Sequence, residues 1–138
     1  MSQSTQAHLD RTISKNLSLE DKKQALSKMQ YYMGAKLIEV GIDPQSVVYR
    51  WSVNALEDKQ ICTLSAYWGD SKARLLSGEE PLTGDDLVSC ARGNAATGVA
   101  KTAQLCGYAK DIDRFQSVLK QTMTEMGLEN KSLNNLLN

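Results

Sequence analysis

Few side chains in this sequence have the type and spacing that nucleophilic or metal chemistry requires. Cys62, Cys90 and Cys106 are candidate nucleophiles, but a cysteine or serine nucleophile needs a neighbouring base, most often a histidine. The single histidine, His8, lies in the N-terminal segment, which is seldom held in a cleft. The same shortage argues against a metal site of clustered histidines and cysteines. We therefore predict no enzyme activity, no catalytic residue, no metal and no cofactor, and three reduced cysteines that pack as small buried hydrophobes.

The segment 93–102, Gly-Asn-Ala-Ala-Thr-Gly-Val-Ala-Lys-Thr, resembles a phosphate-binding loop. Such a loop carries its Lys-Ser/Thr pair directly after the second glycine, whereas two further residues separate Gly98 from Lys101 here. It also lies between a strand and a helix, and this segment instead continues an apolar stripe with helical spacing. We interpret it as a packing helix and predict no nucleotide site.

A second segment, 41–51, resembles the turn and recognition helix of a helix-turn-helix. Gly41 permits a positive φ in the turn, and Ile42 would fill the space between the two helices. The side chains that would face a DNA major groove are Gln45, Ser46 and Arg50. The following stretch is acidic, because residues 39–86 carry nine acids and four bases, and phosphate contacts need the opposite balance. A DNA-binding regulator is therefore the alternative functional hypothesis, with nucleic acid as the less favoured partner.

Helix ends are the clearest structural signal. Residues 18–21, 54–57 and 83–86 each place a capping side chain three residues before an acid. Glycines follow the apolar stripes, as they do after helices. The pattern predicts an all-α fold, a compact bundle of about five helices, with a further N-terminal helix that the pattern defines less well. The predicted helices are 19–40, 44–53, 55–77, 84–106 and 112–126, with 4–16 as the further one.

One region supports a different structure. Two runs near 47–53 and 61–68 alternate apolar and polar residues and are rich in strand-favouring types. An α+β fold, with a β-hairpin at 47–53 and 61–68 packed on helices, is therefore the alternative fold class. The connecting residues contain no glycine and look like a helix start, which favours the helical interpretation.

Length and composition predict one domain in a reducing compartment. A chain of 138 residues with 41% hydrophobic residues can bury its own core, so residues 1–138 are predicted to form a single helical domain. The ends, 1–17 and 128–138, are predicted to be loosely ordered. Apolar runs are too short for a membrane span and the N-terminus has no signal-peptide pattern, so a cytoplasmic location is expected.

A stripe of small residues supplies the main functional hypothesis. Small side chains at helical spacing let a second helix approach closely, from the same chain or from a second copy. The residues of this helix-packing or dimer seam are Ala91, Ala95, Gly98 and Thr102. With no catalytic set, we predict a small helical regulatory or adaptor protein that acts by protein–protein interaction. The predicted partners are another protein and, in a homodimer, a second copy of the chain.

Overall fold

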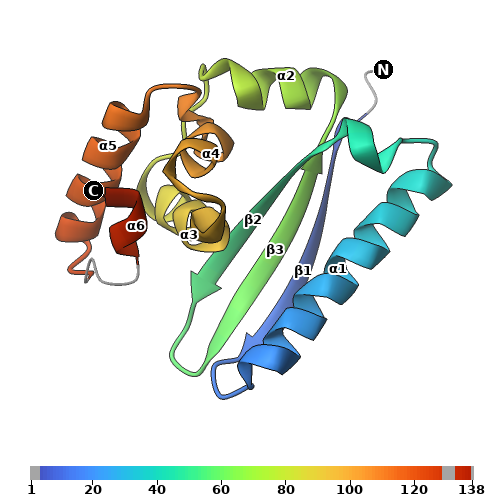
Figure 1. Cartoon of the computed structure of the whole chain (residues 1–138), viewed down its shortest axis with the longest axis horizontal. Helices are drawn as coiled ribbons and strands as arrows, with labels where there is room; N and C mark the ends of the chain where they lie inside the picture. The colour runs from blue at the N-terminus through green and yellow to red at the C-terminus, as the bar shows by residue number, and fades with distance from the viewer. Residues whose placement is uncertain (1–3, 129–132, 138) are drawn as a thin grey trace. The chain divides into compact units, whose positions relative to one another are not determined.

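The structure, a computed structural model, describes residues 4–128 and 133–137 (Figure 1). The chain forms two compact units, 1–72 and 73–138, and each has its own cluster of buried hydrophobic side chains. None of the helices among these residues is both long and apolar enough to cross a membrane.

The first unit is a three-stranded antiparallel sheet with one long helix. Its elements in chain order are β1 (Gln6–Ser14), α1 (Leu19–Glu39), a 3-10 turn η1 (Pro44–Ser46), β2 (Val48–Ala55) and β3 (Lys59–Tyr67). The strand order is β1-β3-β2, so β3 is central and β1 and β2 are the two edges. The chain runs along β1 and returns along α1 beside it (Figure 1).

The all-α prediction is wrong, and the alternative α+β fold with a hairpin is confirmed. β2 and β3 occupy the region predicted as helices 44–53 and 55–77, and β1 occupies the predicted helix 4–16. Leu64 and Ala66 of β3 are fully buried in the same cluster as α1. Burying a leucine such as Leu64 stabilises by about 1.5–3 kcal/mol, more than the roughly 1 kcal/mol of a helix cap. The capping pattern at 54–57 is instead part of the hairpin turn, where Leu56 N–H donates to Lys59 O at 2.8 Å.

The same finding removes the recognition helix of the helix-turn-helix. Gln45 and Ser46 lie in the short turn η1, and Arg50 lies in strand β2. Asp43 caps η1 by accepting from Gln45 N–H at 3.0 Å, as the Asp-Pro pair suggests. These three side chains are therefore not presented on one recognition α-helix, and DNA contact by them stays a prediction.

Helix α1 is confirmed, and it packs on one face of the sheet. Ser18 caps it by accepting from Asp21 N–H at 3.1 Å. Every fourth residue faces the sheet and is buried, and these residues are Ala25, Met29, Met33 and Leu37. They join buried strand residues in one cluster, whose strand members are Ile13, Cys62, Leu64 and Ala66.

The second unit is helical. Its elements are α2 (Gly69–Ser77, which begins in the first unit), α3 (Gly84–Asn94), η2 (Ala95–Thr97), α4 (Val99–Ala103), η3 (Gln104–Tyr108), α5 (Ile112–Glu125) and α6 (Asn134–Leu137). Its largest fully buried side chains are Leu87, Val88, Phe115, Leu119, Met123, Leu133 and Leu136. Helix α5 matches the predicted helix 112–126, and Asp111 caps it by accepting from Arg114 N–H at 3.1 Å.

The prediction of one continuous helix over 84–106 is wrong, because the α-helix is interrupted between Asn94 and Gly98. Gly98 has φ +93°, outside the helical region. The break leaves Asn94 O without its helical partner, and this oxygen accepts from the Thr97 hydroxyl at 2.6 Å. The Thr102 hydroxyl lies 2.8 Å from Asn94 O and 2.7 Å from Gly98 O, so the two oxygens share its one proton. The buried Asn94 side chain donates to Cys90 O at 2.7 Å. A set of local side-chain hydrogen bonds therefore replaces one turn of helix.

The four residues of the predicted seam no longer lie on one helix. Ala91 and Thr102 have no exposed surface, and Ala95 and Gly98 are half-buried. Their role in a dimer stays a prediction.

Both predicted loose ends contain regular structure. Residues 6–14 form β1, and at the other end the described residues 133–137 include α6, whereas 129–132 and 138 lie outside the described part. Gln116 donates to Leu136 O at 2.8 Å and Asn135 to Ala95 O at 2.8 Å, which fixes α6 within the second unit.

Gly107 is the position of the second unit where a side chain should be most disruptive. It has φ +91°, and a Cβ there would lie 2.7 Å from Glu80 O and 2.9 Å from Pro81 Cα. We expect Gly107→Ala to lower the free energy of unfolding by about 2–5 kcal/mol, since the positive φ costs about 1–2 kcal/mol and the backbone clash adds to it. Gly127→Ala is the control, because Gly127 has φ +70° and nothing within 4 Å of the added Cβ. Urea unfolding of both variants measures the difference, and equal losses would contradict the close approach.

Candidate protein-binding surface

Helix α1 and the residue after it carry most of the exposed large hydrophobic side chains of the described residues, and two of these, Tyr31 and Ile38, lie on the outer face of α1, opposite the buried stripe. Five of the eight lie on α1 or at its C-terminal end, with exposed fractions from 58% to 74%: Leu19, Tyr31, Tyr32, Ile38 and Val40. Tyr31 and Tyr32 contact each other edge to face, with ring centroids 5.9 Å apart. Tyrosine is among the residue types that are enriched at protein interfaces.

Small residues lie within this outer face. Tyr31, Ala35 and Ile38 follow one another at steps of four and three, so they share the side of α1 opposite the buried stripe. Ala35 is exposed, and nothing within 4 Å would meet a Cβ on Gly34. Together they form a strip in which the small residues Gly34 and Ala35 follow Tyr31, so a second helix can approach closely there.

Two opposite charges flank this strip on one side. Lys28 and Glu39 are both exposed and are eleven residues apart, which is about three turns, so they point in nearly the same direction. About 16 Å of helix separates them, too far for an ion pair within α1.

The hydrogen-bond pattern of β1 defines which backbone groups face its free edge. Trp68 N–H donates to Thr5 O at 2.9 Å, and Lys15 N–H donates to Asp58 O at 3.1 Å. Antiparallel hydrogen-bonded pairs alternate along a strand, so the odd-numbered residues of β1 bond to β3. The N–H and C=O groups of the even-numbered residues therefore point away from the sheet. Of these, Gln6 O accepts from the Ser4 hydroxyl and Ser14 O from Leu17 N–H, which leaves His8, Asp10 and Thr12 as the open stretch.

A cavity of about 610 Å³ lies along this edge, between β1 and the C-terminal half of α1. Its apolar lining comes from Ala7, Leu37, Val40, Ile42 and Trp68. The polar lining residues are Ser4, Gln6, His8 and Lys36, so Lys36 supplies a positive charge and no carboxylate faces it from the lining.

The other face of the sheet is polar and its side chains form pairs across the strands. His8 Nδ1 lies 2.7 Å from Ser65 Oγ, and Thr63 Oγ1 donates to Asp10 Oδ1 at 2.6 Å. Arg50 donates to the Tyr67 hydroxyl at 2.7 Å, with its guanidinium over the Tyr67 ring at 4.9 Å from the centroid. Polar pairs of this kind stabilise the strand register.

His8, expected in a segment that is seldom held in a cleft, is instead held in β1 beside Ser65. The sequence signal that could have found it is the alternation of Ala7, Leu9 and Ile13 with polar residues. A histidine–serine pair can activate the serine when a third group orients the histidine. The nearest acid along the strand, Asp10, accepts instead from Thr63. The prediction of no enzyme activity stays a prediction.

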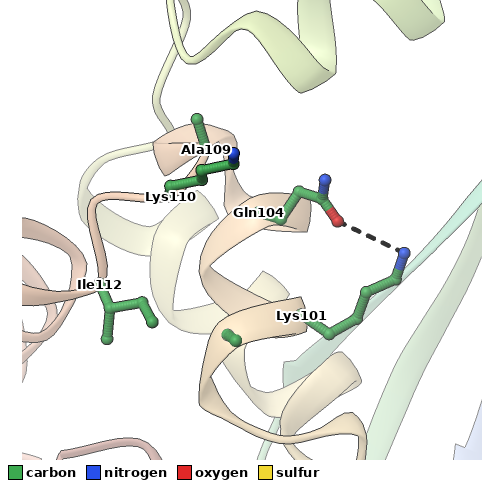
Figure 2. A pocket seen from close by; sticks show the side chains of 6 residues that line it. Lys101, Gln104, Ala109, Lys110 and Ile112 are labelled. Atoms are coloured by element: carbon green, nitrogen blue, oxygen red, sulfur yellow. Dashed lines mark hydrogen bonds between the residues drawn. The ribbon is translucent and has the colours of Figure 1, made fainter.

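A second cavity, of about 410 Å³, belongs to the second unit and is lined by Ala100, Lys101, Gln104, Ala109, Lys110 and Ile112. Figure 2 shows the Lys101 and Gln104 side chains directed toward each other, and Lys101 Nζ lies 3.4 Å from Gln104 Oε1. Both lysines are exposed. Two exposed lysines beside a cavity do not indicate which ligand, if any, it binds.

The three cysteines form no disulfide with one another and are buried, as the sequence predicts. Burial raises the pKa of the Cys62 thiol, although Lys22 acts in the opposite direction. The described residues contain no group of three or more His, Cys, Asp or Glu side chains that could hold a metal ion.

Comparisons with protein-family models, with curated proteins and with solved structures gave no match for this chain.

Burial of the thiols leads to a direct test. In the folded protein at about pH 7.5, we expect iodoacetamide to leave Cys62, Cys90 and Cys106 unmodified over minutes, because all three are buried from the reagent and burial also raises the pKa of Cys62. After unfolding in guanidinium chloride, all three should react. Mass spectrometry of the intact protein counts the added groups. Rapid labelling of Cys62 in the folded state would contradict its placement between the sheet and α1.

Proposed function

We propose that this protein is a small regulatory or adaptor protein of the cytoplasm that acts by binding other proteins. We further propose that the outer face of α1 joins two copies of the chain into a homodimer. The observation that supports this is the exposure of Tyr31 and Ile38 beside small residues on one helix face. Contiguous exposed apolar surface on a folded protein commonly marks an interaction site.

The charges beside this face make it complementary to itself. When two α1 helices pack antiparallel about a two-fold axis between residues 33 and 34, Lys28 of each copy lies beside Glu39 of the other. In the same arrangement the Tyr31 ring lies near Gly34 and Ala35 of the second copy, where there is room for it. A single helix of 21 residues is about 31 Å long, so this interface is small and we expect a dissociation constant in roughly the micromolar range.

Truncation of the exposed side chains tests the helix face. We expect Tyr31→Ala and Ile38→Ala each to raise the dimer dissociation constant by about tenfold, because both lose apolar contact in the interface. Sedimentation equilibrium over a concentration series measures that constant. Leu56→Ala is the control, since Leu56 is 38% exposed but lies in the β2–β3 turn. A protein that stays monomeric throughout the series would remove the dimer from the proposal.

A charge exchange tests the antiparallel arrangement itself. Lys28→Glu alone, or Glu39→Lys alone, places like charges together at two symmetric positions, and each should weaken the dimer by roughly tenfold. The double variant Lys28→Glu/Glu39→Lys restores opposite charges across the interface and should recover most of the affinity. Recovery is informative because these residues are too far apart to pair within one helix.

The same sedimentation series serves for these three variants, with circular dichroism to verify folding. If the double variant is as weak as the singles added together, the two-fold axis is not where we place it.

A further inference from the structure

We propose that the free edge of β1, with the cavity beside it, binds an extended peptide of another protein by strand addition. On the side facing α1, the peptide would carry an apolar side chain near Ala7 and an acidic side chain near Arg11. This binding goes beyond the α1 dimer, because it uses a different surface and a different partner.

First, the edge of β1 that faces away from β3 has unpaired backbone groups. His8, Asp10 and Thr12 direct their N–H and C=O groups outward, and none of them bonds to other described residues through these groups. Protein edge strands are commonly kept from pairing by a proline, a bulge, lysines or other charges, and of these β1 has only the charges of Asp10 and Arg11. β1 is nine residues long, pairs with β3 at every position and contains no Pro, Gly or Lys. Such an edge is a template for another strand.

The second argument is the cavity, which lies where the side chains of an added strand would point. Alternate residues of that strand would face α1, as Ala7, Leu9 and Arg11 do. A residue opposite Ala7 would enter the cavity, whose apolar wall includes Trp68 and Leu37. Pockets for alternate side chains give strand addition its specificity.

Third, Lys36 and Arg11 place positive charge on the α1 side of this edge. Lys36 lines the cavity, and Arg11 lies on the α1 side of β1, between Leu9 and Ile13, with its side chain exposed. No carboxylate lines the cavity to neutralise Lys36. An acidic side chain of the peptide opposite Arg11 would therefore meet a cation on the side facing α1.

The probes are two fluorescein-labelled heptapeptides, Thr-Glu-Thr-Val-Thr-Leu-Thr and its reverse, Thr-Leu-Thr-Val-Thr-Glu-Thr. When Val lies opposite Leu9, antiparallel addition of the first probe places Leu opposite Ala7 and Glu opposite Arg11. Parallel addition of the second probe gives the same placement. We expect one of the two to bind more tightly, as fluorescence anisotropy will measure. A third peptide with Lys in place of Glu should bind at least tenfold more weakly than the better probe.

The decisive variants are His8→Pro and its matched control His8→Ala. Both remove the imidazole and its contact with Ser65, but only proline removes the outward N–H and places a ring at the edge. Proline is tolerated at this position of an edge strand, because the lost N–H is not in the ladder to β3. We expect His8→Ala to keep the affinity within about threefold, and His8→Pro to lower it by at least tenfold.

A second variant tests the charge without altering the backbone of the strand. Arg11→Glu should weaken the Glu-containing probe by about tenfold and strengthen the Lys-containing peptide. Tyr31→Ala, on the outer face of α1, should leave peptide affinity unchanged, so failure of the dimer and failure of this site can be told apart. Amide hydrogen exchange gives an independent readout, since the N–H groups of His8, Asp10 and Thr12 should become protected when the probe is bound.

Three results would overturn the proposal. The first is that neither probe binds at millimolar concentration, and the second is that His8→Pro binds as well as His8→Ala. The third is that His8→Pro abolishes self-association, measured by sedimentation, while no probe binds, which would assign the edge to a second copy of the chain.

Discussion

The fold of the first unit depends on one packing contact, in which the buried stripe of α1 packs against alternate side chains of the sheet. Met29, Met33 and Leu37 of α1 meet Leu64 and Ala66 of the central strand, and all five are almost completely buried. Because side chains alternate along a strand, this contact fixes which residues of every strand face α1 and which face away. A slip of one residue would exchange the two faces.

Both candidate surfaces follow from that packing. The register that buries one face of β1 also turns the backbone of His8 and Asp10 toward the open edge. The stripe that buries one side of α1 leaves Tyr31 and Ile38 on the opposite side. The unit therefore presents a free strand edge and an apolar helix face as separate surfaces, and each is suited to a protein partner by a different kind of contact.

Local signals in the sequence predicted part of this structure well. Ser18 and Asp111 are side-chain caps, and the helices that they begin have the predicted extents within about two residues. The alternating runs gave the hairpin as the alternative fold. The misleading signal was the segment 54–57, where a cap-like pattern coincides with a tight turn. A helix cap contributes about 1 kcal/mol to stability, so the burial of large apolar side chains against residues distant in the chain outweighs it.

By itself the sequence determined the helix ends of α1 and α5, the buried state of the cysteines and the alternation in β2 and β3. These properties depend on residues close together in the chain, whose spacing is visible in the sequence. Only the tertiary structure decided that 6–14 forms a strand, that His8 contacts Ser65 and that the helix is interrupted at Gly98. Each of these requires contacts between residues distant in the chain, or a local hydrogen-bond set that competes with helix, and neither is encoded by periodicity alone.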